Sequence, residues 1–169
     1  MIIVCPLNKA QPLVDQHRAS HVVSLLGPDT PHRSFSGIMP EKHLKLTFHD
    51  IVQSADGLTA PRAADAERLV DFLRAWDREK PMLIHCWAGI SRSTAAAFTA
   101  MCLFKPNASE DDLAWQLREA SPSATPNRLI VGLTDQLLGR QGRMLRAIEA
   151  IGRGADAFEG MPFMLDPRD

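Results

Sequence analysis

The stretch PMLIHCWAGISRSTAAAFTAMCLFKP, residues 81–106, passes from an apolar run through a glycine-containing loop into an alanine-rich segment. Residues 82–84 follow a proline and are typical of a short buried strand. Residues 94–104 favour a helix, which a second proline ends. The sequence therefore predicts a strand, a loop and a helix start, with His85 and Cys86 at the end of the strand.

Such a loop is suited to a tetrahedral anion. Unpaired backbone N–H groups at a helix start converge on one spot, and the helix dipole adds partial positive charge there. Gly89 allows a loop backbone that a side chain would obstruct, and the guanidinium of Arg92 can hold two phosphate oxygens at once. The same positive field favours the thiolate of Cys86 as a nucleophile. The hydroxyl of Ser93 can donate to that sulfur when it departs.

The segment HCWAGISRS, residues 85–93, resembles the His-Cys-x5-Arg-Ser/Thr signature of the cysteine-dependent protein tyrosine phosphatases, in the form closest to the dual-specificity branch. Weaker similarity extends over residues 2–138, with Pro126-Asn127 and Gln136-Leu137 in a terminal helix. The resemblance implies the phosphatase α/β fold. The residues that it assigns to phosphate binding are Trp87, Ala88, Gly89, Ile90, Ser91 and Arg92, with His85 in support.

The resemblance also implies a mechanism without a metal or other cofactor. Cys86 attacks phosphorus, a phosphocysteine forms, and water hydrolyses it. A carboxylic acid must protonate the leaving group. Asp50 occupies the place of the family's general acid, but its loop is longer than usual and carries a rival, Asp56, in an Asp-Gly pair that is also typical of a plain turn. Asn127 either braces the phosphate loop or caps its own helix.

Composition bounds the class of protein. The chain has 169 residues, which suits one domain, and a formal net charge of -1 at pH 7, so no overall basic field attracts nucleic acid or an acidic membrane. Three cysteines without paired spacing favour a reducing compartment. No apolar run approaches the roughly 18 residues of a membrane span. We expect a cytoplasmic protein.

Apolar runs alternate with helical periodicity along the chain. Strands are predicted at 2–5, 21–26, 43–48 and 82–84, and helices at 12–19, 61–77, 94–104, 109–120 and 127–138, the last renewed beyond Gly139 and Gly142. This order predicts an α/β fold with a central, mostly parallel sheet of about four strands and helices on both faces. We expect a phosphatase-like catalytic domain over 1–152 and a C-terminal tail over 153–169, which either docks through Phe158, Met161 and Phe163 or stays loose.

Two further residues have open roles. Arg33 lies in a polar loop, 27–41, that either connects two strands or lines the substrate cleft. Cys5 is either a core residue or a disulfide partner for Cys86 under oxidation.

The sequence therefore predicts a phosphomonoester hydrolase, a protein tyrosine or dual-specificity phosphatase. Its partners would be a phosphorylated protein or another phosphomonoester, with phosphate, sulfate or vanadate in the loop, and neither nucleic acid nor a membrane. The neutral residues 87–91 favour a phosphoprotein over a phosphoinositide. Two alternatives are a phosphate-binding module without turnover, favoured if neither Asp50 nor Asp56 reaches the cleft, and a cysteine enzyme of the arsenate-reductase or rhodanese kind. The segment AGISRS and the absence of a closely spaced second cysteine argue against the latter.

Overall fold

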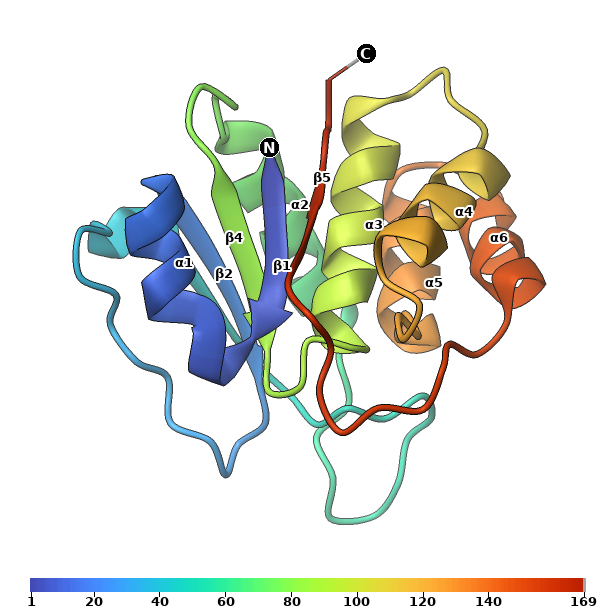
Figure 1. Ribbon diagram of the computed structural model, residues 1–169. Helices are drawn as coiled ribbons and strands as arrows, with labels where there is room; N and C mark the ends of the chain where they lie inside the picture. The colour runs from blue at the N-terminus through green and yellow to red at the C-terminus, as the bar shows by residue number, and fades with distance from the viewer. Residues whose placement is uncertain (169) are drawn as a thin grey trace.

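A computed structural model describes residues 1–168, within which one five-stranded sheet has the order β3-β2-β4-β1-β5 and six α-helices surround it (Figure 1). The strands are β1 (Ile2–Pro6), β2 (His21–Leu26), β3 (His43–Thr47), β4 (Met82–Cys86) and β5 (Phe163–Leu165). The helices are α1 (Ala10–His17), α2 (Ala63–Ala75), α3 (Arg92–Phe104), α4 (Glu110–Ala120), α5 (Arg128–Leu137) and α6 (Arg143–Ile151). The predicted α/β class is confirmed, with one strand more than the expected four.

The sheet directs four loops toward one edge. Strands β1 to β4 are parallel, and β4 pairs with β2 on one side and β1 on the other. All five residues of β4 are buried, as its apolar sequence predicts. Parallel strands share a carboxyl edge, where open α/β sheets bind ligands. The loops after β1, β2, β3 and β4 therefore meet where the cysteine loop leaves the sheet.

Helices cover both faces of this sheet, as predicted. Helix α1 packs on one face, over a cluster that includes Ile3, Cys5 and Leu83. Helices α2 and α3 cover the other face, and α4, α5 and α6 form a further layer beyond α3 (Figure 1). Alanines in α3 bring that buried helix close to the sheet, because small side chains permit a close approach.

The start of α2 differs from the predicted residue 61, for a local reason. Helix α2 begins at Ala63 rather than at residue 61, because the carboxylate of Asp65 accepts a hydrogen bond from the backbone N–H of Arg62 at 2.9 Å and caps the helix there. The helix predicted over 127–138 is confirmed as α5, and the renewed helical segment beyond it is the separate helix α6, because Gly139 and Gly142 have φ angles of 64° and 80°. These left-handed conformations end one helix and begin the next.

The C-terminal tail docks along its length up to residue 168, and Asp169 lies outside the described residues. Arg118 in α4 donates hydrogen bonds to the carbonyls of Ile151 and Gly152 at 2.9 and 2.8 Å, which fixes where the tail departs from α6. The tail then crosses below α3 and pairs antiparallel with β1 as β5 (Figure 1). Phe163 is buried there, whereas Phe158 and Met161 remain exposed. The added strand covers the edge of β1.

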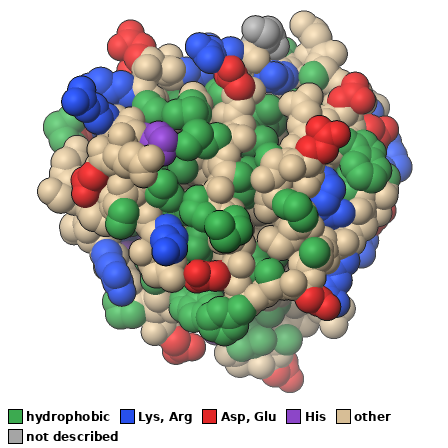
Figure 2. Space-filling view, viewed as in Figure 1, with side chains coloured by type: hydrophobic (Ala, Val, Ile, Leu, Met, Phe, Trp, Pro, Cys, Tyr) green, Lys and Arg blue, Asp and Glu red, His purple; other side chains and the backbone are tan. Residues whose placement is uncertain are grey.

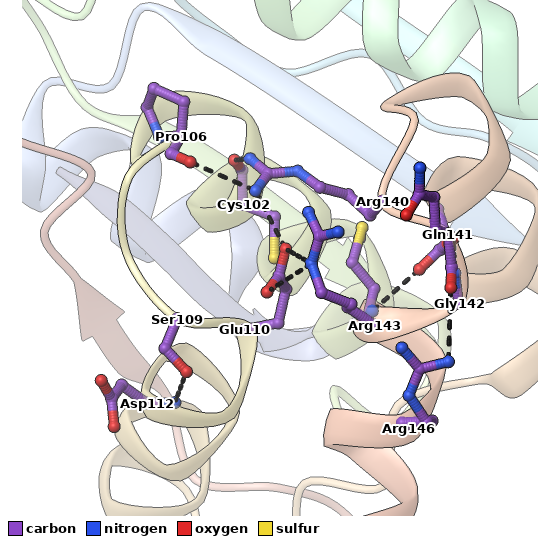
Figure 3. Close-up of polar contacts among 12 residues, drawn as sticks. Cys102, Pro106, Ser109, Glu110, Asp112, Arg140, Gln141, Gly142, Arg143 and Arg146 are labelled. Carbon is purple, nitrogen blue, oxygen red and sulfur yellow. Dashed lines mark hydrogen bonds and ion pairs between the residues drawn. The ribbon is translucent and has the colours of Figure 1, made fainter.

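A buried ion cluster joins α4 to the start of α6 (Figure 3). The carboxylate of Glu110 accepts hydrogen bonds from Arg140 at 2.9 Å and from Arg143 at 3.2 Å. Arg140 also donates to the carbonyls of Cys102 and Pro106. Burial by itself raises the pKa of Glu110, but hydrogen bonds and the two arginine charges outweigh it, so the net shift is downward. The carboxylate is therefore ionised near neutral pH.

Replacing Glu110 by alanine should lower the free energy of unfolding by about 3 kcal/mol, because it leaves Arg140 buried without its counter-ion. Urea unfolding at neutral pH measures this loss. Glu119→Ala is the matched control, since Glu119 is an exposed glutamate of the same helix and its removal should change the stability by less than about 0.5 kcal/mol. Equal losses in the two variants would contradict the role of the cluster.

Candidate active site

The loop over residues 87–91, between β4 and α3, has its carbonyl groups fixed from outside. Backbone N–H donors reach these carbonyls from distant segments: Leu7 to Trp87 at 3.1 Å, Gly160 to Ala88 at 2.8 Å, Thr125 to Ile90 at 2.9 Å and Asn127 to Ser91 at 3.2 Å. Since the N–H of a planar trans peptide points opposite to its C=O, the loop amides face inward. The loop is thus a concave set of amide donors at a helix start, which suits an anion.

Gly89 is required in this loop on two counts. Its φ is 72°, a conformation that other L residues rarely adopt. A Cβ on it would lie 2.7 Å from the backbone N of Pro6 and 2.8 Å from the carbonyl carbon of Cys5. The loop therefore packs directly on the end of β1. The backbone amide of Gly89 also donates a hydrogen bond to the sulfur of Cys86 at 3.2 Å.

The candidate nucleophile lies at the end of β4, where this loop begins, with the predicted serine beside it. The Sγ of Cys86 is 3.1 Å from the Oγ of Ser93, in the first turn of α3. Both side chains are buried against the sheet. The hydroxyl of Ser93, which is able to donate, and the amide of Gly89, which does donate, thus both contact the sulfur. They can stabilise a thiolate at that position, because both hydrogen bonds strengthen when sulfur carries charge.

Arg92 is a buried cation with an unused donor. The residue is only 8% exposed, and its Nη1 donates to the carbonyl of Phe48 at 3.0 Å. Its Nε has no hydrogen-bond partner among residues 1–168. A buried unpaired donor on a charged group is costly. An anion in the loop would supply the missing partner, as the two-oxygen role predicted for Arg92 requires.

Asp50 reaches the loop from the end of β3. Its Oδ1 accepts hydrogen bonds from the hydroxyl of Ser91 at 2.7 Å and from the Nδ2 of Asn127 at 2.8 Å. Both donors use the same oxygen, and Oδ2 forms no hydrogen bond among the described residues. Asp56, by contrast, is exposed and forms no hydrogen bond or ion pair with the loop among the described residues. The geometry favours Asp50 over its rival.

Asn127 combines the two roles that the sequence left open. Its Oδ1 accepts from the amides of Leu129 and Ile130, both at 3.1 Å, and so caps α5. Its Nδ2 donates to Asp50 and, at 3.1 Å, to the carbonyl of Ile51. One side chain thus fixes the helix start and the acid loop together, while its backbone amide holds the carbonyl of Ser91.

Behind Cys86 lies a chain of three polar side chains within the sheet. The Nε2 of His85 is 2.6 Å from the Oγ of Ser24, which is 2.8 Å from the Nε2 of His43. The other ring nitrogen of His85 faces the carbonyl of Cys86 at 3.3 Å and must carry its proton, because a carbonyl only accepts. Ser24 therefore donates to His85 and accepts from His43. The chain fixes the orientation of His85 beneath the cysteine.

The structure resembles solved phosphatases. PTP-2 phosphatase of Cydia pomonella is 21% identical, with a TM-score of 0.61 over 80% of this chain and 84% of that one. Human DUSP28 is 16% identical, with a TM-score of 0.61 over 83% and 92% of the two chains. PTPMT1 in complex with PI(5)P is 14% identical, with a TM-score of 0.59 over 89% and 94%. The chain has the dual-specificity phosphatase fold. No protein-family model matches the sequence, and no curated protein does.

Within the dual-specificity phosphatase fold, several contacts of this chain have only a weak sequence signal. Ser24 is a lone serine in an otherwise apolar strand, which is the signal that a polar partner lies inside the sheet. Two hydrogen bonds join His49 to Thr59: the backbone amide of His49 donates to the carbonyl of Thr59 at 2.8 Å, and the amide of Thr59 donates to the His49 ring at 2.9 Å. They close the base of the loop that carries Asp50 and Asp56. The ten-residue separation of His49 and Thr59 gives no local pattern.

The three cysteines are reduced, and Cys5 does not face Cys86. The two lie on neighbouring strands, but Cys5 belongs to the cluster below α1 and Cys86 to the cluster below α3. Their side chains thus point to opposite faces of the sheet, which argues against a disulfide between them. Burial, with a smaller effect of Cys86, raises the pKa of Cys5 to about 12. Its environment is that of a core residue.

Two findings concern ligands and membranes. Within residues 1–168, no group of three or more His, Cys, Asp or Glu side chains is arranged to hold a metal ion. None of the helices in that range combines the length and apolar character that crossing a membrane demands.

Histidines in the polar chain should make stability depend on pH. Burial lowers the pKa of His85 to about 4 and, together with the charge of Lys45, that of His43 to about 4. Unfolded histidines titrate near about 6.5. The unfolded chain therefore binds protons that the folded chain does not, and stability that is complete above about pH 6.5 is lost as the pH falls toward 4, by up to about 1.4 kcal/mol per pH unit for each ring.

Urea unfolding at a series of pH values below 7 measures this slope. The variant His43→Gln keeps an Nε2 donor for Ser24 but removes one titrating ring. Its slope should be shallower than the native slope by about one proton. Identical slopes in the native chain and the variant would show that His43 does not remain neutral on folding.

Proposed function

We propose that the protein is a phosphomonoester hydrolase that acts through a phosphocysteine, with protein tyrosine or dual-specificity phosphatase activity. The observation that carries this proposal is the hydrogen bond of 2.7 Å between Asp50 and Ser91, which brings a carboxyl group to the loop that holds the cysteine. An acid from the loop after β3 then lies beside the loop that holds the nucleophile and the anion site. The similar structures of named phosphatases support the same function.

In the first step, the phosphate would lie on the loop amides and on the free donors of Arg92, with its phosphorus facing Cys86. The Sγ thiolate forms a bond to phosphorus while the bond from phosphorus to the leaving oxygen breaks. Asp50 gives its proton from Oδ2 to that oxygen, which departs as a neutral alcohol or phenol. The loop donors and Arg92 stabilise the charge on the transferring group, because they are fixed before the reaction begins.

In the second step, Asp50 is ionised and accepts a proton from water as the water attacks phosphorus. The bond between sulfur and phosphorus breaks and Cys86 leaves as a thiolate. Ser93 supports this departure by donating its hydroxyl to the sulfur. No step uses a metal or another cofactor. Because a free thiol is required, we propose that the protein works in a reducing compartment such as the cytoplasm.

A reductase of the arsenate type is less well supported. It would require a second cysteine close to Cys86, whereas Cys5 is on the other face of the sheet and Cys102 lies near the C-terminal end of α3, beside Arg140. A phosphate-binding module without turnover would use the same loop. The presence of Asp50 beside the loop favours the enzyme.

Hydrolysis of p-nitrophenyl phosphate across pH tests the proposal. Cys86→Ser should abolish turnover, and Asp50→Asn should lower kcat by about 100-fold or more and remove the fall of activity at alkaline pH, because the acid is lost. Asp56→Asn, on the same loop, is the matched control and should behave as the native chain does. A native chain that binds vanadate but shows neither a burst nor turnover would instead be a binding module.

A further inference from the structure

Two large aromatic side chains lie exposed next to the catalytic loop. Phe158, from the C-terminal tail, is 82% exposed, and Trp87, which directly follows Cys86, is 47% exposed. Their ring centroids are 5.6 Å apart and the rings meet edge to face at 80°. Exposed aromatic residues that group together on a surface typically mark a site of interaction.

The tail holds Phe158 in this position from both sides. Upstream, the amide of Ala155 donates to the carbonyl of Pro122 at 2.9 Å, and downstream the amide of Gly160 donates to the carbonyl of Ala88 at 2.8 Å. Glu159 accepts a hydrogen bond of 3.0 Å from Asn8. A Cβ on Gly160 would come within 2.9 Å of the carbonyl oxygen of Gly89, so the tail passes directly against the loop. The backbone on both sides of Phe158 is therefore held against the loop and its surroundings.

The two rings form one side of a groove of about 290 Å³. It is lined by Leu7, Asn8, Arg33, Trp87, Phe158 and Glu159. Successive residues of an extended peptide advance by about 3.3 Å. Trp87 lines the groove and directly follows Cys86 in the chain, so the groove begins beside the cysteine loop. If a phosphorylated residue of a peptide lies in the loop, the peptide side chain one or two positions away would therefore reach the groove.

The charges of the groove favour a peptide over a membrane surface. Arg33 is exposed and forms no salt bridge among the described residues, whereas Glu159 is engaged by Asn8. A single free arginine can pair with one acidic side chain, but recognition of anionic lipid commonly uses clusters of about four to eight basic residues. Acidic and basic side chains are interspersed over the face that includes the tail (Figure 2).

We propose that this groove binds the segment that flanks the phosphorylated residue of a protein substrate, taking a large apolar side chain against Phe158 and Trp87 and an acidic side chain beside Arg33. The inference rests on the proposed phosphatase function and specifies its substrate class. It assigns the tail, which lies outside the phosphatase signature, a part in substrate selection.

Substrates with and without flanking residues test the groove. We compare kcat/KM for p-nitrophenyl phosphate, for a phosphotyrosine peptide with Asp and Leu beside the phosphotyrosine, and for the same peptide with Ala at both positions. The native chain should prefer the Asp/Leu peptide. Phe158→Ala and Arg33→Gln should each lower kcat/KM for that peptide by about tenfold and leave p-nitrophenyl phosphate unchanged. Met161→Ala is the matched control, because Met161 is also 82% exposed in the tail but lies outside the groove.

Several outcomes would overturn this inference. Equal losses for peptide and p-nitrophenyl phosphate would mean that Phe158 only supports the loop, and no preference between the two peptides would mean that the groove is unused. A further substrate is a phosphoinositide presented in phosphatidylcholine vesicles. If Phe158→Ala and Arg33→Gln lower kcat/KM for this lipid substrate alone, the groove binds lipid. If the native chain turns over no substrate, the proposed function fails. The groove can still be tested by calorimetry, which measures the affinity of the Asp/Leu phosphopeptide for the Cys86→Ser variant with and without Phe158→Ala. Equal affinities would overturn the groove.

Discussion

The amides of the cysteine loop face inward because its carbonyl groups are bound from outside. The four donors, at Leu7, Thr125, Asn127 and Gly160, belong to three segments that are distant from the loop in sequence. They come from the end of β1, the connection between α4 and α5, and the tail. A loop of five residues would not hold this arrangement alone, since each carbonyl would otherwise bind water and the backbone would rearrange. The sheet, the outer helices and the tail are therefore all needed to form one anion site.

The charges around this site are arranged before any ligand arrives. Arg92 is buried with a donor unused, so the protein bears the cost of an incompletely paired cation that a phosphate would relieve. The histidines behind Cys86 are neutral by burial, which leaves Arg92 and the loop amides as the source of positive potential. Asp50 lies at the rim, with one oxygen bound and one available. The donors of the loop are thus fixed in place before an anion binds.

The tail connects stability with recognition. Its strand β5 covers the edge of β1, and its middle part lies against the loop through Gly160. The same segment leaves Phe158 in solvent beside Trp87. An exposed aromatic residue stabilises little by itself, and its place beside the loop is the observation behind the substrate groove proposed above.

The strand, loop and helix around Cys86 and Arg92 follow from the amino-acid sequence, because strand, turn and helix signals are local and their spacing is short. The alternation of elements was enough for the α/β class, and the resemblance was enough to propose Asp50. The pairing of Ser24 with His85 and His43, the double role of Asn127 and the docking of the tail became visible only in the folded chain. These depend on contacts between residues far apart in the chain, which no local periodicity records.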